Sequence, residues 1–295
     1  MSLCVSISSF PTECGVSLVA RQSLSDWYVR AELIDRMDAH GVPDTEVAER
    51  LDYSPQTIAN WRKGSGQPTV GDVREFFLHY GDGDEEALLY MQQVVRSKKA
   101  DLKYMEADAR FNALMLAKGE LHYRDIFKWQ PQILPGVVQT REFHFEVLQK
   151  TEGSSDEGAE FGWAFKERRV EGILGRTDEY KMSLILGHGV FSWLHAMTPE
   201  GRRRQLDRLR ELNNLPGWQI RVMTGPHTFG GNFELFLPNG NATAGPAFVF
   251  AEIQDRSWCL EEPNRVKLYH ESIKPNRLRA IPLEEYLDAE RDRLA

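Results

Sequence analysis

Residues 44–64 read DTEVAERLDYSPQTIANWRKG, and this stretch decides how the first third of the chain folds. Its first part predicts a short helix, capped by Asp44, with three apolar positions facing inward, Val47, Ala48 and Leu51. Ser54 is a suitable N-cap for a second helix, and Pro55 fits its first position because no N–H donor is needed there. Gly64 is expected to end this helix. The pattern is that of two short helices joined by a tight turn.

Two further amphipathic helices flank this pair. One is expected to begin at Trp27, with Asp26 as its N-cap, and to end at Gly41. Its inward positions share one stripe, Leu33, Ile34 and Met37. The other covers residues 70–80 and carries five apolar positions, Val70, Val73, Phe76, Phe77 and Tyr80. The sequence therefore predicts an all-α domain over residues 26–82 that contains a helix-turn-helix.

Residues 29–80 resemble the Xre, or lambda-repressor-like, family of DNA-binding domains. The resemblance rests on the helix spacing and on Ala48, a small residue where the two helices approach closely. Asp52 stands where the family usually has Gly, and Asp tolerates left-handed backbone better than most residues do. In this family the second helix of the motif enters the major groove of DNA with its N-terminus first.

The resemblance implies roles for residues in and after this second helix. Three of them would reach base edges or nearby phosphates, Gln56, Thr57 and Asn60. Gln and Asn suit adenine because each can donate and accept in one bidentate pair. Four others would lie near the phosphate backbone, Arg62, Lys63, Ser65 and Gln67. Pro55 would offer only an apolar contact to a thymine methyl group.

Charge is unevenly placed for a DNA-binding chain. The whole chain carries a net charge of −8, and residues 1–80 hold seven Lys and Arg against eleven Asp and Glu, a net charge of −4. Most DNA-binding modules are basic. Residues 53–71 nevertheless hold two cations and no anion, so the expected contact surface is locally positive. We expect a single domain to bind DNA non-specifically with weak affinity and a shallow salt dependence. The alternative is that the helical domain binds a protein instead of DNA.

The following stretch, residues 84–118, has neither Gly nor Pro and predicts a helical connector. Its apolar positions recur every seven residues, with two methionines between them, Leu88, Met91, Val95, Leu102, Met105, Ala109 and Leu116. One interpretation is a helix that dimerises the chain. The other, slightly favoured, is a stripe that packs on the C-terminal domain of its own chain. A homodimer is expected in either case, because paired half-sites about 34–36 Å apart give such motifs their affinity.

The C-terminal region changes pattern and predicts a mixed α and β domain. Predicted strands cover residues 182–186, 218–223, 232–237, 248–253 and 258–260, and predicted helices cover 199–212, 264–278 and 283–294. The fold class is therefore α+β. The predicted divisions are a flexible arm at 1–25, the helix-turn-helix domain at 26–82, the helical connector at 83–130 and a regulatory or partner-binding domain at 131–295.

Residues 133–140 read ILPGVVQT. Pro135 and Gly136 make a tight turn after which a helix can start. The run resembles the Pro-Gly-Leu-Leu-Gln-Thr signature of an actinobacterial C-terminal domain of unknown function that often follows this kind of helix-turn-helix, although Val137 and Val138 replace the leucines. The resemblance implies a regulator or an antitoxin-like protein encoded beside a small partner protein.

Enzyme motifs are missing from the sequence. It has no phosphate-binding GxxxxGK[ST] loop, no GxSxG elbow and no HExxH zinc motif. We therefore expect no catalytic residues, no metal and no cofactor. His188, His227 and Glu252 are alternatives for a cleft, and the run 202–204 of three arginines is more simply a solvated helix face than an anion site.

The chain has three cysteines and no CxxC pair, which favours a reduced, cytoplasmic protein. It has no apolar run of about 18 residues, so we expect no membrane span. The function predicted from these features is sequence-specific regulation of transcription. The chain would bind double-stranded DNA as a homodimer and be controlled through its C-terminal domain. The alternative is an antitoxin-like adaptor that binds a small partner protein.

Overall fold

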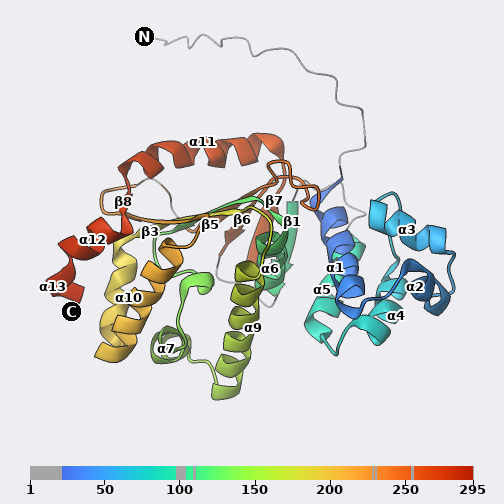
Figure 1. Cartoon of the computed structure of the whole chain (residues 1–295), viewed down its shortest axis with the longest axis horizontal. Helices are drawn as coiled ribbons and strands as arrows, with labels where there is room; N and C mark the ends of the chain where they lie inside the picture. The colour runs from blue at the N-terminus through green and yellow to red at the C-terminus, as the bar shows by residue number, and fades with distance from the viewer. Residues whose placement is uncertain are drawn as a thin grey trace, which may run out of the picture.

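A computed structural model describes residues 22–97, 104–108, 111–227, 229, 231–253 and 256–294. It joins a helical N-terminal bundle to a mixed eight-stranded sheet that is covered by helices on both faces (Figure 1). The α+β class predicted from the sequence is confirmed. The predicted arm lies mostly in residues 1–21, which are outside the described residues.

Five helices form the bundle: α1 (Leu24–His40), α2 (Asp44–Arg50), α3 (Pro55–Lys63), α4 (Val70–Tyr80) and α5 (Glu85–Ser97). The predicted start of α3 is confirmed, since Ser54 accepts a hydrogen bond from the N–H of Thr57 and Pro55 is the first helical residue. Gly64 ends this helix at a φ of 73°, a left-handed conformation that glycine adopts without strain. Asp52 has a φ of 57°, as its place in the turn requires.

Two predicted caps are wrong. Helix α1 begins at Leu24, because Ser23 supplies the cap by accepting from the N–H of Asp26. Asp26 lies in the first turn, where its negative charge interacts favourably with the positive end of the helix dipole. Asp44 is the first residue of α2 and makes no cap bond; its carboxylate pairs with Arg62 instead.

The single helical connector expected over residues 84–118 is interrupted by a strand. Helix α5 ends at Ser97, and strand β1 (Tyr104–Asp108) pairs antiparallel with β7 before helix α6 (Asn112–His122) begins. Five of the apolar heptad positions pack into the core of their own chain, Leu88, Met91, Val95, Met105 and Leu116. Leu102 and Ala109 lie outside the described residues. The five described positions thus pack within their own chain, and α5 packs on α1 and α4 of the bundle.

The sheet has the strand order β1-β7-β6-β5-β2-β3-β4-β8. Its members after β1 are β2 (Asp125–Gln130), β3 (Lys181–Gly187), β4 (Trp218–Met223), β5 (Phe233–Leu237), β6 (Phe248–Glu252), β7 (Arg256–Leu260) and β8 (Ile281–Pro282). Strands β2, β3 and β4 are parallel, and the other pairs are antiparallel. The five strands predicted in this region are confirmed within a few residues, whereas β1, β2 and β8 were not predicted.

Helices cover the two faces unequally. One face carries α6, α9 (Asp156–Leu174) and α10 (Pro199–Asn213), and the other carries α11 (Pro263–Arg279), as Figure 1 shows. The predicted last helix is two, α12 (Leu283–Ala289) and α13 (Arg291–Leu294). Between β2 and α9 the chain forms a 3₁₀ turn, η2 (Gly136–Val138), and one irregular helix made of α7 (Arg141–Phe143), η3 (His144–Leu148) and α8 (Gln149–Glu152); after β3 comes η4 (His188–Ala196).

Two apolar clusters fill the core. The smaller one lies between the sheet and α11 and includes Trp129, Phe233 and Ile273. The larger one lies on the opposite face and continues without a break into the helical bundle, from Leu184 in the sheet to Trp27 in α1 and Ile58 in α3. The bundle and the sheet domain therefore share one core. Of the helices described, none is long and apolar enough to cross a membrane.

Candidate functional site

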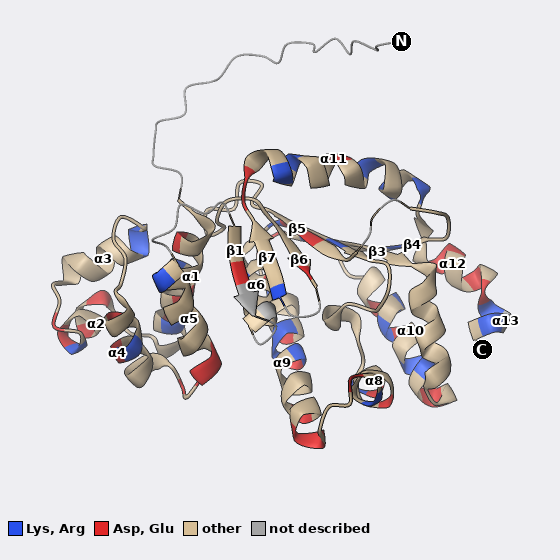
Figure 2. Cartoon of the chain, turned by 180° about the vertical axis from the view of Figure 1, so that it is seen from behind, with Lys and Arg blue, Asp and Glu red and all other residues tan. Residues whose placement is uncertain are grey.

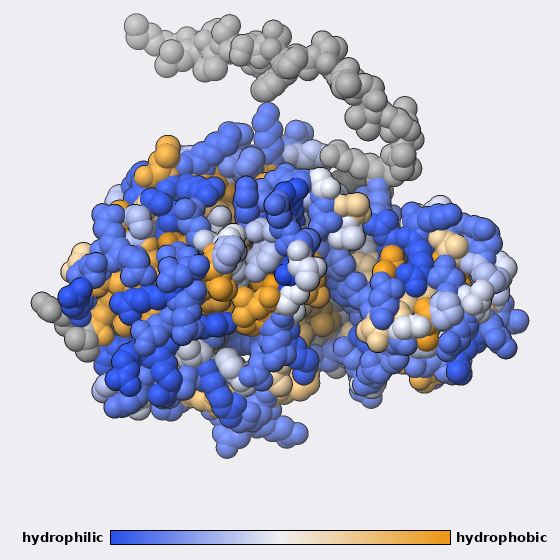
Figure 3. All heavy atoms as spheres, in the orientation of Figure 1, coloured by the Kyte–Doolittle hydropathy of each residue, from blue (hydrophilic) through white to orange (hydrophobic). Residues whose placement is uncertain are grey.

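Helix α3 buries one face and leaves the other open. Ile58 and Trp61 lie on the inner face and are buried in the bundle core. Pro55, Gln56 and Lys63 are exposed. Figure 1 shows α3 on the side of the bundle away from the sheet, with α1 between them. The surface around this face is mainly hydrophilic in the view of Figure 3.

The three residues predicted to reach bases lie at the start and middle of α3. Gln56 donates from Nε2 to Oδ1 of Asn60 at 2.9 Å, so the two amides, one turn apart, form a pair on the helix surface. The Thr57 hydroxyl lies 3.0 Å from the Ser54 hydroxyl, which ties Thr57 to the cap. The structure thus brings Gln56 and Asn60 together with their unused donor and acceptor groups on one exposed face.

The four residues predicted to lie near phosphates differ in their surroundings. Arg62 forms ion pairs with Asp44 and, at 3.3 Å, with Asp38, so its guanidinium links α3 to α2 and α1. Lys63 and Ser65 are exposed, and the Ser65 hydroxyl donates to the carbonyl of Asn60 at 3.3 Å. Gln67 is half-buried, and its buried Oε1 has no hydrogen-bond partner in the described part of the chain.

One cation beside α3 was not predicted from the spacing of residues in the sequence. Arg30 of α1 is half-buried and approaches Gly64, where a Cβ atom would lie 3.5 Å from its guanidinium. Burial lowers the pKa of Arg30, although it stays charged near neutral pH. Figure 2 shows basic residues gathered at the C-terminal end of α3, with acidic residues on the adjacent α2. The local positive surface is therefore narrow.

Helix α1 belongs to the bundle and also anchors it to the sheet domain. Its Trp27 is fully buried, and the indole N–H donates to the carbonyl of Thr243 at 2.8 Å. The Trp27 ring meets Tyr123 edge-on with centroids 5.1 Å apart. Gly245 lies so close that an added Cβ would come 2.4 Å from Cγ of Trp27. Only glycine leaves room for the indole at this place.

An ion cluster strengthens the same junction. Lys118 of α6 contacts Glu32 at 2.8 Å and Asp35 at 2.5 Å, and both acids belong to α1. His122 lies 3.0 Å from the same oxygen of Asp35. Burial alone would raise the pKa of Glu32, but the charges of Lys118 and Arg36 outweigh it and hold this pKa below its usual range. Ion pairs as well as apolar contacts thus hold the bundle on the sheet domain.

A second ion cluster lies inside the sheet domain. Lys128 of β2 is fully buried and contacts Glu120 at 2.7 Å and also Glu234. Arg169 of α9 donates to both oxygens of Glu120, at 2.8 and 2.7 Å. Burial would raise the pKa of Glu120, but Arg169 and Lys128 hold it well below its usual range, whereas burial raises the pKa of Glu234. The cluster ties α6, α9, β2 and β5 together.

The predicted signature run at 133–140 forms a braced loop. Gln205 of α10 is fully buried; its Oε1 accepts from the N–H of Thr140 and its Nε2 donates to the carbonyl of Val138, each at 2.8 Å. Gln139 donates to the carbonyl of Leu134 at 2.6 Å. The two glutamines satisfy backbone groups that would otherwise be buried without partners, which explains why this loop needs them.

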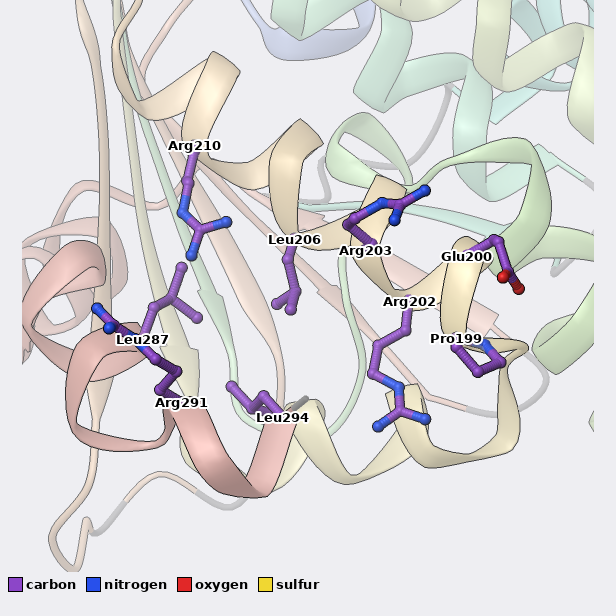
Figure 4. Close-up of a pocket in the computed structure, with 9 residues that line it drawn as sticks. All are labelled: Pro199, Glu200, Arg202, Arg203, Leu206, Arg210, Leu287, Arg291 and Leu294. Carbon is purple, nitrogen blue, oxygen red and sulfur yellow. The ribbon is translucent and has the colours of Figure 1, made fainter.

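The arginine run of α10 does more than face solvent. Arg202 and Arg203 line a groove of about 310 Å³ together with Arg210 and with Arg291 of α13, while Glu200 stands at its edge (Figure 4). Three leucines form the apolar part of the lining, Leu206, Leu287 and Leu294. Arg210 pairs with Asp207 and Glu284, and Arg291 with Asp288. No group of three or more His, Cys, Asp or Glu within the described ranges has the geometry to hold a metal ion.

These features define a two-part α+β protein, in which a helical bundle with one open, capped helix is fixed through α1 to a mixed sheet domain. The chain belongs to the DUF5753 family, a domain of unknown function, whose model matches residues 116–285. This match covers most of the region where the sequence predicted a C-terminal domain without known chemistry.

Other comparisons add little. No curated protein matches the chain. One similar solved structure is that of TrmBL2, an archaeal chromatin protein whose structure is described as showing a novel mode of DNA binding. Its TM-score is 0.35 and its sequence identity 10%, over 77% of this chain and 68% of that chain. A likeness this weak carries no argument about fold or function.

Proposed function

We propose that the chain is a sequence-specific, DNA-binding regulator of transcription that places α3 in the major groove. The observation that carries the proposal is the form of this helix: Ser54 caps it, Ile58 and Trp61 bury one face, and Gln56 and Asn60 share the open face. A helix presented in this way fits the groove, which is about 12 Å wide. The resemblance of residues 29–80 to the Xre family supports the same use.

The proposal includes a homodimer, because one bundle offers few base contacts and few free cations. With Arg62 held by Asp38 and Asp44, the positive surface of a single bundle rests largely on Lys63 and Arg30. A dimer on two half-sites of DNA would double both the number of base contacts and the number of cations near phosphates. The protein is proposed to act in the cytoplasm without catalysis, metal or cofactor. Light scattering of the purified chain should give twice the chain mass of 33.9 kDa.

Base recognition is tested with Gln56→Ala, Asn60→Ala and the double variant. Binding is measured to DNA from upstream of its own gene and to random DNA at one salt concentration. Each lost bidentate contact should cost about 1–3 kcal/mol on the specific DNA alone. Gln132→Ala, an exposed glutamine far along the chain, is the control. Unchanged discrimination in the double variant would remove the base-reading role.

A second candidate function is that of an adaptor for a small, neighbour-encoded partner protein, and the arginine groove of Figure 4 favours it. A leucine floor edged by arginines suits an apolar segment with acidic side chains. Arg203→Glu should weaken co-purification of such a partner, while Arg168→Glu, on the exposed side of α9, should leave it unchanged. Equal retention by both variants would count against the groove.

A further inference from the structure

A separate cavity of about 330 Å³ lies in the sheet domain between α9, α10 and the braced loop. Gln139 and Thr140 of the loop, Trp163, Lys166 and Val170 of α9, and Arg208 of α10 contribute to its lining. It does not include any residue of the arginine groove or of α3. Its volume is at the lower end of the range for small-molecule sites.

Lys166 is the unusual residue of this cavity. Its ammonium group donates to Oε1 of Gln139 at 2.7 Å and to Nδ1 of His144 at 3.0 Å. The carbonyl of Ala159 lies 2.8 Å from Nε2 of His144 and can only accept, so Nε2 carries the proton and Nδ1 is the acceptor for Lys166. Burial and the nearby Lys166 charge lower the pKa of His144, which keeps the ring neutral at pH 7.

Both partners of Lys166 are therefore uncharged. Among the residues that the structure describes, these two are its hydrogen-bond partners, and no carboxylate forms an ion pair with it. Burial lowers the pKa of Lys166 to about 8; the Glu152 charge acts against this shift and the Arg169 charge adds to it. At pH 7 the group is still mostly protonated. A largely buried cation with neutral partners and a third N–H to donate is a site that attracts an anion.

The rest of the lining narrows the ligand class. Arg208 adds a second half-buried cation whose nearest acid, Glu211, is 4.0 Å away. Trp163 and Val170 add an aromatic and an aliphatic wall, which an inorganic anion would leave uncovered. Arg141, Glu167 and Glu171 also line the cavity, but all three are exposed, and Arg141 is paired with Glu160.

We propose that this cavity binds a small organic acid, with its carboxylate on the Lys166 ammonium and its apolar body against Trp163 and Val170. The carboxylate would supply the counter-charge that Lys166 lacks, and Arg208 would add a second attraction. The proposal does not depend on DNA binding, because it concerns a different domain and is tested by direct titration.

The test uses calorimetric titration of the full chain with benzoate and, separately, with inorganic phosphate. Benzoate should bind, and Lys166→Met should weaken this binding at least about tenfold, since a side chain of similar length without the ammonium group removes both the charge and its N–H donors. Lys150→Met, an exposed lysine on α8, should leave the affinity unchanged. Should Lys166→Met fold poorly, as judged by its thermal unfolding, Arg208→Gln provides a second variant with the same expected direction.

Proton uptake gives a readout that depends on Lys166 itself. A bound carboxylate raises the pKa of this ammonium, so benzoate binding at pH 8 should take up protons and its heat should depend on the ionisation enthalpy of the buffer. Affinity should fall as the pH rises above about 8. No benzoate binding at millimolar concentration, equal binding by wild type and Lys166→Met, or binding of phosphate alone would each overturn the proposal.

Discussion

The indole N–H of Trp27 donates to the carbonyl oxygen of Thr243, across a gap of 216 residues in the sequence. Trp27 belongs to the first helix of the bundle, and Thr243 to the loop between β5 and β6 of the sheet domain. Because α1 also packs on α3, α4 and α5, one helix carries the contacts of both parts. Any change at this contact is therefore expected to reach the bundle that presents α3.

Trp27→Ala tests how much the junction stabilises the fold. The substitution removes a fully buried indole and leaves a cavity against Tyr123 and Gly245, so it should lower the free energy of unfolding by about 3–5 kcal/mol. Leu78→Ala on α4 is the control, since Leu78 is 69% exposed and should change stability by less than about 0.5 kcal/mol. Urea unfolding measures both. A loss below about 1 kcal/mol for Trp27→Ala would contradict the anchoring role.

Local signals in the sequence were enough to place α3. Ser54, Pro55 and Gly64 act through their own backbone and near neighbours, so their effect can be predicted without knowing the tertiary structure. The same holds for the five strands that were predicted in the C-terminal region, whose alternating or continuous apolar runs are visible in a short window.

Features that depend on distant partners could not be predicted. Strand β1 exists because it pairs with β7, about 150 residues later, and its own five residues resemble a helix continuing from α5. Strand β2 contains Lys128 at a fully buried position, which breaks the apolar pattern expected of a central strand. In the candidate site, Arg62 pairs with Asp38 and Asp44 because three helices pack together, and the sequence does not show this packing. The position of Arg62 in the sequence led only to the prediction of a phosphate contact.

Arg62 and Lys63 are adjacent but should respond differently to substitution. Arg62→Ala removes ion pairs that join α3 to α1 and α2, and should lower the free energy of unfolding by about 1 kcal/mol. Lys63→Ala removes an exposed charge and should change stability by less than about 0.5 kcal/mol. If α3 lies on DNA, Lys63→Ala should instead reduce the slope of log K against log salt by about 1. Unfolding curves and a salt titration of DNA binding separate the two roles, and a reversed pattern would contradict the assignment.

The buried cluster around Lys128 should show strong coupling. Lys128→Met leaves Glu234 buried without its cation, while Arg169 still holds Glu120, so the loss of stability should be about 3–5 kcal/mol. Adding Glu234→Gln removes the uncompensated charge and should recover part of that loss, so that the double variant is more stable than Lys128→Met. Urea unfolding of the two single variants and the double variant gives the coupling energy. Additive losses would show that the two side chains do not act as a pair.

Acid should weaken the junction between α1 and α6 in a defined pH range. Lys118 and Arg36 hold the pKa of Glu32 below its ordinary value of 4.5, and His122 and Lys118 hold the pKa of Asp35 below its ordinary value of 3.8. These carboxylates therefore stabilise the fold above those values and lose that contribution as the pH falls. Lys118→Met should therefore cost about 3 kcal/mol at pH 7, where it leaves both carboxylates charged with fewer partners. The difference from wild type should shrink as the pH falls below about 4, because protonation then removes the carboxylate charges in both proteins.

Urea unfolding at intervals from pH 7 to pH 3 measures this pH dependence, with the exposed Lys150→Met as control. A stability difference that stays constant over the whole range would mean that Lys118 acts through packing and not through its charge.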